Sequence, residues 1–232
     1  MEIKVLASAE AVARQGAATI AGAARAAIAA RGRFVLAVSG GQTPWLMLRD
    51  LAGEDIPWNG VHVAQVDERV APAGHSDRNL THLRESLLEH APLRAEQIYA
   101  MPVETIDLEA AASRYAETLR GIAGSPPVFD LVHLGLGPDG HTASLVPGDP
   151  VLDATDGDVA LTGVYQGRRR MTLTYPMINR SRRILWLVTG TDKVAMLMRL
   201  RDGHRSIPAG RIARDNARVI ADRAAVGQLE AN

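Results

Sequence analysis

The residues best suited to chemistry lie in the segment Asp130–Gly148, where one histidine, His141, follows a glycine-rich turn. The run Phe129–Leu134 before this turn is mostly apolar and is bounded by proline and glycine, which is typical of a buried parallel strand. Thr142 to Ser144 suit the opening of a short helix, so we expect His141 near the positive end of a helix dipole. That position disfavours the imidazolium, and a neutral imidazole can accept a proton. His141 is therefore a candidate general base, and the alternative is a structural histidine in a turn.

The letters G-L-G-P-D-G in this turn have the form of a dinucleotide-binding fingerprint, but their context differs from it. The fingerprint follows the first strand of a βαβ unit and precedes a long helix, with an acidic residue about 20 positions further on. Here the motif lies past mid-chain, and Pro147, Pro150 and a loop-like group of aspartates follow it. We therefore expect no nicotinamide cofactor.

A second segment, V-S-G-G-Q-T-P, places hydroxyl groups and glycine amides between an apolar strand and a helix. Its residues Ser39, Gly40, Gly41 and Thr43 predict an anion site at a helix N-terminus. Because the G-K-[ST] of a P-loop is missing, this site would hold a single phosphate rather than a nucleoside triphosphate. The alternative is an ordinary strand-to-helix turn with Thr43 as the N-cap.

A third segment begins D-E-R and supplies two carboxylates beside the guanidinium of Arg69, directly after an apolar strand. At the carboxyl end of a strand, Asp67 and Arg69 become candidates for binding and for stabilising negative charge. The chain has no cysteine, and neither G-x-S-x-G nor H-E-x-x-H occurs in it. A phosphate loop, an arginine and a neutral histidine suit direct attack of water on an electrophilic phosphosugar carbonyl.

Strands that alternate with helices must position these three segments. The pattern predicts helices over 8–30, 43–52, 79–89, 108–122 and 193–200, and strands over 34–38, 61–66, 129–134, 170–174, 184–188 and 218–221. We expect one mostly parallel sheet covered by helices on both faces, an α/β fold with three layers. In such a sheet, ligands bind beyond the carboxyl ends of the strands, near the point where the strand order reverses. No linker is visible, so we expect a single domain over residues 1–232.

Composition excludes several classes of function. Basic and acidic residues number 26 each, so no global field attracts nucleic acid. No apolar run is long enough for a membrane span, and the first residues do not resemble a signal peptide. We expect a cytoplasmic protein, and the missing cysteines and the missing paired-histidine motif do not favour a metal site.

Five motifs together resemble those of the glucosamine-6-phosphate isomerase/6-phosphogluconolactonase family, in the same order and at similar spacing. They are V-S-G-G-Q-T-P, V-D-E-R-V-A-P-A-G-H-S-D-R-N, G-L-G-P-D-G-H-T-A-S-L-V-P-G, R-M-T-L-T-Y-P-M-I-N and L-V-T-G-T-D-K. The similarity extends from about Val5 to Leu229. D-G-H-T-A-S and D-E-R resemble the lactonases of this family rather than its deaminases, which carry N-G-H and D-E-Y-type sequence.

The resemblance implies the three-layer fold shared by the deaminases, ribose-5-phosphate isomerase and the coenzyme A transferases. It implies an enzyme, a monomer or weak homodimer, that hydrolyses 6-phospho-D-glucono-1,5-lactone to 6-phospho-D-gluconate in the oxidative pentose phosphate pathway, without an organic cofactor. His141 matches the base that activates water, Arg69 the residue that stabilises the oxyanion or holds substrate, and Arg170 an arginine near the phosphate. Asp67 completes the expected catalytic residues. Gly137 and Asp139 complete the expected substrate-binding residues, beside the phosphate loop.

Departures from the family pattern leave substrate fit open. Arg78 stands where D-S-N is common, Val146 stands where S-L-F-P is common, and a tryptophan often found between Pro208 and Arg218 is missing. Two rival functions remain at this point. A sugar-phosphate isomerase or deaminase would need a carboxylate base, for which Asp67 is the candidate, and a non-catalytic sugar-phosphate sensor would normally carry a DNA-binding module.

Overall fold

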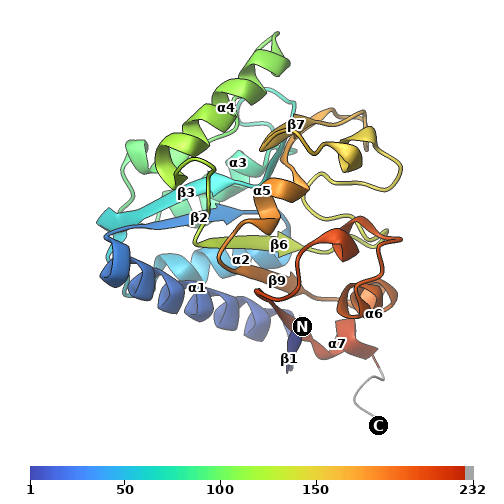
Figure 1. Ribbon diagram of the computed structural model, residues 1–232. Helices are drawn as coiled ribbons and strands as arrows, with labels where there is room; N and C mark the ends of the chain where they lie inside the picture. Colours follow the sequence, from blue (N-terminus) through green and yellow to red (C-terminus); the bar gives the residue numbers. More distant parts are fainter. Residues whose placement is uncertain (228–232) are drawn as a thin grey trace.

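A seven-stranded parallel sheet forms the centre of the computed structural model, which describes residues 1–227 (Figure 1). Leu229, where the family resemblance ends, lies outside the described residues. The strand order is β1-β10-β9-β6-β2-β3-β5, and every neighbouring pair is parallel. The strands are β1 (Glu2–Leu6), β2 (Phe34–Val38), β3 (Val61–Gln65), β5 (Ile98–Tyr99), β6 (Leu131–Gly135), β9 (Ile184–Val188) and β10 (Ala217–Asp222).

Helices cover both faces of this sheet, as expected. They are α1 (Ala9–Arg31), α2 (Gln42–Ala52), α3 (Asn79–Leu83), α4 (Leu108–Ala123), α5 (Tyr175–Asn179), α6 (Val194–Asp202) and α7 (Arg223–Val226). Figure 1 shows α1 and α2 on one side of the sheet and α4 and α5 on the other. The side chains of β2 alternate accordingly: Leu36 packs into the apolar cluster with α1 and α2, whereas Val35 packs into the cluster with α4 and α5. The expectation of a three-layer α/β fold is confirmed.

The first long helix begins and ends as its sequence predicts. Ser8 is the N-cap, and its hydroxyl accepts a hydrogen bond from the backbone N–H of Ala11. Gly32 ends the helix in the left-handed conformation, with φ of 73°. Nine buried residues, mostly alanines, form the face of α1 that packs on the sheet, so this helix covers one side of the core.

A second, three-stranded sheet was not expected. Its order is β4 (Asp67–Arg69), β8 (Arg170–Leu173) and β7 (Val159–Leu161), and both pairs are antiparallel. Two expectations are therefore wrong: Arg170–Leu173 does not join the parallel sheet, and Asp67–Arg69 is a strand rather than part of a loop. The cause is the short connection from β7 to β8, which contains no helix. A strand that follows another without a crossover connection pairs with that strand in the opposite direction, as β8 does with β7.

The topology places four loops at one edge of the large sheet. Strands β9, β6, β2 and β3 are neighbours, so their carboxyl ends meet at this edge. From β2 the chain proceeds to β3 on one side, and from β6 it proceeds to β9 on the other. The strand order therefore reverses between β2 and β6, where a crevice for ligands is expected. None of the helices within residues 1–227 has the length and apolar character needed to cross a bilayer.

Candidate active site

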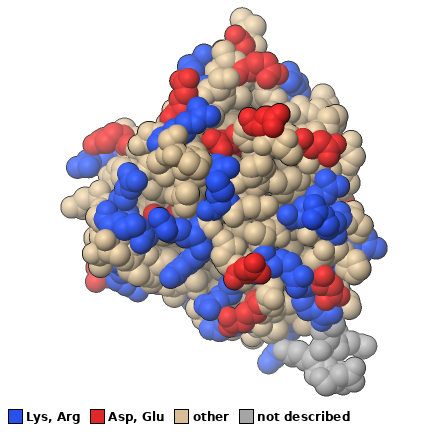
Figure 2. Space-filling model, viewed as in Figure 1, with Lys and Arg blue, Asp and Glu red and all other residues tan. Residues whose placement is uncertain are grey.

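A cavity of about 420 Å³ lies over this crevice. Its walls come from the loops that follow β2, β6 and β9, and from β4, α3 and β8. Nine of the ten residues expected from the sequence line it: Ser39, Gly40, Gly41, Thr43, Asp67, Arg69, Gly137, His141 and Arg170. The tenth, Asp139, contacts His141 directly. On the face drawn in Figure 2, side chains of both charge signs are distributed over the surface.

His141 and Asp139 form a short hydrogen-bonded pair. Nδ1 of His141 lies 2.6 Å from Oδ1 of Asp139, and the same oxygen accepts the backbone N–H of His141 at 3.1 Å. Burial would raise the pKa of the Asp139 carboxyl, but hydrogen bonds from the backbone and imidazole of His141 and from Tyr165 outweigh burial and lower it. An ionised carboxylate only accepts hydrogen bonds, so in the neutral imidazole Nδ1 carries the proton and the lone pair lies on Nε2. The ring is thereby oriented to take a proton at Nε2.

The helix expected after His141 is absent, which corrects the sequence interpretation. Thr142 and Leu145 close a tight turn through a backbone hydrogen bond of 2.9 Å, and Ala143 has a φ of 51°. Asp139, rather than a helix dipole, therefore orients the imidazole. Gly137 makes room for the ring, because a Cβ at this position would lie 2.1 Å from Nδ1 of His141.

The phosphate loop has the expected glycines and a different helix start. The N-cap of α2 is Gly41, with φ of 130° and no side-chain capping bond, so Thr43 is not the N-cap. Thr43 lies in the first turn, and its hydroxyl is 2.7 Å from that of Thr189 after β9. The first N–H groups of α2, at Gln42 and Thr43, receive no side-chain cap and border the cavity.

The hydroxyl and the N–H of Ser39 both contact His133 of β6, so neither is free to donate to a ligand. Its hydroxyl donates to the backbone oxygen of His133 at 3.1 Å, and its N–H points to Nδ1 of that histidine at 3.4 Å. Burial lowers the pKa of His133 to about 3, so its ring is neutral. Ser39 therefore fixes the loop to β6, and the N–H groups that remain for an anion come from the residues after it.

Arg69 and Arg170 line another wall of the cavity, from neighbouring strands of the small sheet. Arg69 donates from Nη1 to the backbone oxygen of Asp77 at 3.1 Å and to Oδ1 of Asn79 at 2.8 Å. Arg170 is buried, and its pKa is lowered, chiefly by burial and then by the charge of Arg69. Asp67 lies nearby, with Oδ2 accepting the hydroxyl of Ser144 at 2.6 Å. Arg69, Arg170 and Asp67 thus place two positive charges and one carboxylate at the same wall of the cavity.

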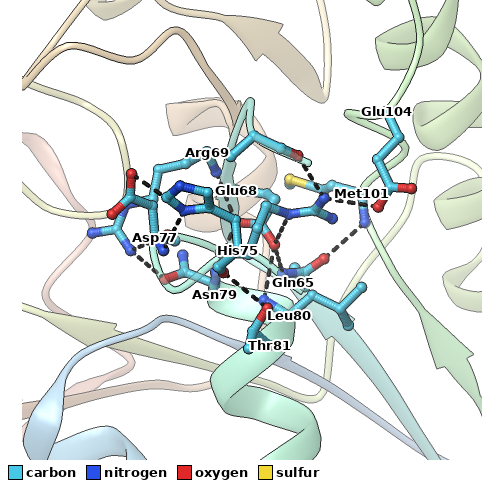
Figure 3. Close-up of polar contacts among 12 residues, drawn as sticks. Gln65, Glu68, Arg69, His75, Asp77, Asn79, Leu80, Thr81, Met101 and Glu104 are labelled. Carbon is cyan, nitrogen blue, oxygen red and sulfur yellow. Dashed lines mark hydrogen bonds and ion pairs between the residues drawn. The ribbon is translucent and has the colours of Figure 1, made fainter. Parts of the chain in front are cut away.

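Glu68 organises this wall without lining the cavity (Figure 3). Its carboxylate is fully buried and accepts the backbone N–H groups of Arg69, Asn79 and Leu80, each at 2.8 Å. The side-chain amide of Gln65 donates to it at 2.9 Å. Glu68 therefore ties β4 to the start of α3, and this tie sets the positions of Arg69 and Asn79.

Arg78, one of the departures from the family pattern, is part of the same buried network. Its Nε lies 3.1 Å from Glu68, and its Nη1 donates to Glu104 at 2.8 Å and to the backbone oxygen of Ala71 at 2.9 Å. Arg78 and Val146 are both buried, and neither is among the described residues that line the cavity. These two departures therefore do not change the cavity lining directly, and Arg78 acts on this wall only through Glu68.

Lys193 and Asn79 line the cavity and were given no role from the sequence. Lys193 follows β9, with Nζ 2.8 Å from Oδ2 of Asp192. The hydrogen bond from Lys193 is the main cause that lowers the pKa of Asp192. The motif L-V-T-G-T-D-K could have indicated Lys193, since its loop follows a strand in the same way as the other three loops.

Comparison with known proteins gives one consistent relationship. The family described as glucosamine-6-phosphate isomerases/6-phosphogluconolactonase matches residues 7–221. The 6-phosphogluconolactonase of Synechocystis is 41% identical over 172 residues, which are 72% of this chain and 71% of that protein.

Solved structures agree with this relationship. The 6-phosphogluconolactonase of Thermotoga maritima superposes with a TM-score of 0.85 at 25% identity, over 95% of this chain and 98% of that chain. A monomeric glucosamine-6-phosphate deaminase shares the fold, with a TM-score of 0.84 at 18% identity over 97% of this chain and 98% of that chain.

Proposed function

The chain belongs to the glucosamine-6-phosphate isomerase/6-phosphogluconolactonase family, and from this premise we propose that it hydrolyses 6-phospho-D-glucono-1,5-lactone with His141 as the base. The reaction yields 6-phospho-D-gluconate and belongs to the oxidative pentose phosphate pathway. The observation that carries the proposal is the His141–Asp139 pair, which places the lone pair of the neutral imidazole on Nε2, in a cavity that Arg69 and Arg170 also line.

The proposed reaction begins with water beside the lactone carbonyl. Nε2 of His141 takes a proton from this water as its oxygen bonds to C1, and the carbonyl becomes a tetrahedral oxyanion. Arg69 stabilises the negative charge with a guanidinium that is already held by Asp77 and Asn79. The bond from C1 to the ring oxygen then breaks, the imidazolium returns its proton to that oxygen, and the resulting carboxylic acid ionises.

The phosphate of the substrate is proposed to bind at the start of α2. The uncapped N–H groups of Gln42 and Thr43 and the helix dipole favour a dianion there. Lys193 adds positive charge to this end, because the Thr43–Thr189 contact brings the loop after β9 against the phosphate loop. Arg170 binds other oxygens of the substrate, and Asp67 supplies the negative charge that balances Arg69 and Arg170.

The proposed mechanism needs residues from most of the expected domain. The cavity draws on loops from residue 39 to residue 193, so we treat residues 1–232 as a single catalytic domain. Gly137 acts by admitting the imidazole, and Asp139 acts by orienting it, rather than by binding substrate. Asp67 lies in the cavity but accepts a hydrogen bond from Ser144, which suits a counter-charge better than a base for an isomerase.

Acid release from freshly prepared 6-phosphogluconolactone tests the proposal, with the spontaneous rate subtracted. We expect the purified protein to accelerate hydrolysis near pH 7 without added metal or cofactor. Ammonia release from glucosamine 6-phosphate under the same conditions tests the deaminase alternative. Ammonia release without lactone hydrolysis would reject the proposed reaction while leaving the fold assignment in place.

A further inference from the structure

A tyrosine outside the expected site contacts the candidate base from the small sheet. Tyr165 lies between β7 and β8, and its hydroxyl donates to Oδ2 of Asp139 at 3.0 Å. Its ring meets the imidazole of His141 edge-on, with centroids 5.6 Å apart and planes at 65°. The tyrosine therefore contacts both members of the pair.

The two oxygens of Asp139 have separate donors. Oδ1 accepts the backbone N–H and Nδ1–H of His141, whereas Oδ2 accepts the hydroxyl of Tyr165. With both oxygens bound, the plane of the carboxylate is fixed, and this plane sets the direction in which the imidazole points. Without the tyrosine hydroxyl, the carboxylate could rotate about its side chain, and Nε2 would lose its fixed direction.

The backbone around Tyr165 forms a tight turn. Tyr165 and Arg168 exchange two backbone hydrogen bonds, of 3.0 and 3.2 Å. The central residues Gln166 and Gly167 both have positive φ, 51° and 77°, as type I′ hairpin turns require. A two-residue turn of this kind leaves little freedom, so it can present the phenol in one position.

Side chains of the turn also contact the elements that carry the two arginines. Arg168 donates from Nε to Oδ2 of Asp77 at 3.0 Å, and the backbone oxygen of Asp77 accepts from Arg69. Gln166 accepts from Arg170 at 3.1 Å, and the guanidinium of Arg170 lies 4.9 Å from the centroid of the Tyr165 ring. These contacts of Arg168 and Gln166 thus hold the turn in place around Tyr165.

We propose that Tyr165 is a positioning residue for hydrolysis, which holds Asp139 and through it His141 in the orientation that proton transfer requires. This inference rests on the proposed function, since it assumes that His141 is the base. Tyr165 does not line the cavity and its hydroxyl donates to Asp139, so the effect of this hydroxyl must pass through Asp139 rather than through contact with substrate.

Kinetics of Tyr165→Phe test the proposal, because phenylalanine keeps the ring and removes only the hydroxyl. We expect kcat to fall about tenfold, with KM within about twofold of wild type, since the lost hydrogen bond has a charged acceptor and no substrate contact changes. Tyr175→Phe is the matched control. That substitution also removes a hydroxyl with one acceptor, the backbone oxygen of Pro208, and should leave both constants unchanged.

A double-mutant cycle with Asp139→Ala separates positioning from a general structural effect. If Tyr165 acts through Asp139, adding Tyr165→Phe to Asp139→Ala should change kcat by less than about twofold. Equal losses in the two backgrounds, a wild-type kcat in Tyr165→Phe, or a change confined to KM would overturn the proposal. An inactive wild-type protein would instead refute the proposed function, so the two failures are distinguishable.

Discussion

Arg69 and Arg170 lie directly opposite each other as paired residues of the antiparallel strands β4 and β8. Like charges at such positions repel, and each guanidinium here lines the same cavity. The repulsion is visible in Arg170, whose pKa is lowered by burial and by the charge of Arg69. An anionic substrate or oxyanion between the two side chains would relieve the repulsion, so the arrangement favours binding of negative charge over stability of the free protein.

Replacing Arg69 by lysine should lower kcat by about tenfold or more while keeping the charge. A lysine cannot hold Asp77 and Asn79 and still present a planar pair of donors to an oxyanion. Steady-state kinetics on the phosphorylated lactone measure the effect. Arg182→Lys, at an exposed arginine outside the cavity lining, is the control and should behave as wild type. Equal kinetics in the two variants would show that Arg69 does not take part in the reaction.

Removing the imidazole in His141→Ala should lower kcat by roughly 10²- to 10⁴-fold, the range for loss of a general base. The side chain is partly exposed and fills little of the core, so the Tm should change little. Lactone hydrolysis with the spontaneous rate subtracted is the assay, and His90→Ala, on the surface, serves as the control. Near-native turnover in His141→Ala would exclude His141 as the base.

Gly41→Val should raise KM for the phosphorylated lactone, because a side chain at this position obstructs approach of an anion to the start of α2. Glucono-1,5-lactone without the phosphate should be a poor substrate for the wild type. Valine at φ of 130° is also strained, and Gly74→Val controls for strain because Gly74 has φ of 74°, no atoms near its Cβ position and no place in the cavity lining. Similar kcat/KM for the two lactones would contradict a phosphate site at this loop.

Arg78→Met should destabilise the protein by about 3 kcal/mol, since it leaves the buried carboxylate of Glu68 without its cation. The loss should lie at the low end for buried pairs because N–H groups still donate to Glu68. Urea denaturation measures the free energy of unfolding. Arg218→Met removes an exposed ion pair with Glu2 and should cost less than about 1 kcal/mol. Equal losses would mean that the Glu68–Arg78 pair adds nothing specific.

His133 should make the protein less stable in mild acid. Its pKa is about 3 in the folded protein and 6.5 as the ordinary value, so between these values the unfolded chain binds more protons. The cost of keeping His133 neutral in the folded protein is therefore absent above pH 6.5. Below this pH, the unfolding free energy decreases as the pH falls, by up to about 1.4 kcal/mol per pH unit. His133→Gln should flatten the dependence of the unfolding free energy between pH 6.5 and 5, whereas the surface variant His90→Gln should not. An unchanged slope in His133→Gln would contradict this origin.

Much of the cavity could be predicted because the relevant signals are local. A buried strand followed by Ser39–Thr43, by Asp67–Arg69 or by the turn before His141 is visible in sequence, and parallel strands bring such ends to one edge. The helical dipole at His141 was a wrong inference from Thr142 to Ser144, whose residue types suit a helix start and a tight turn alike.

The remaining features depend on contacts between distant segments. The small sheet pairs β4 with β8, which lie about a hundred positions apart in the chain, and no periodicity encodes that pairing. The hydrogen bonds of Ser39 to His133 and of Tyr165 to Asp139 likewise depend on packing rather than on a motif. Gln166 and Gly167 still gave a weak signal, since a glycine in a short polar segment between two strands is typical of a hairpin.

The division of the site between two sheets separates the loss of activity from the loss of the fold. The base and the phosphate loop extend from the seven-stranded sheet, whereas both arginines belong to strands of three and four residues. Although β8 is buried, strands of three and four residues have few ladder bonds, so we expect them to open at a lower free energy than the seven-stranded sheet, through sub-global unfolding. Local opening of β4 and β8 would abolish chemistry while the larger sheet stayed intact, so we expect activity to be lost at a lower temperature than the fold of the larger sheet.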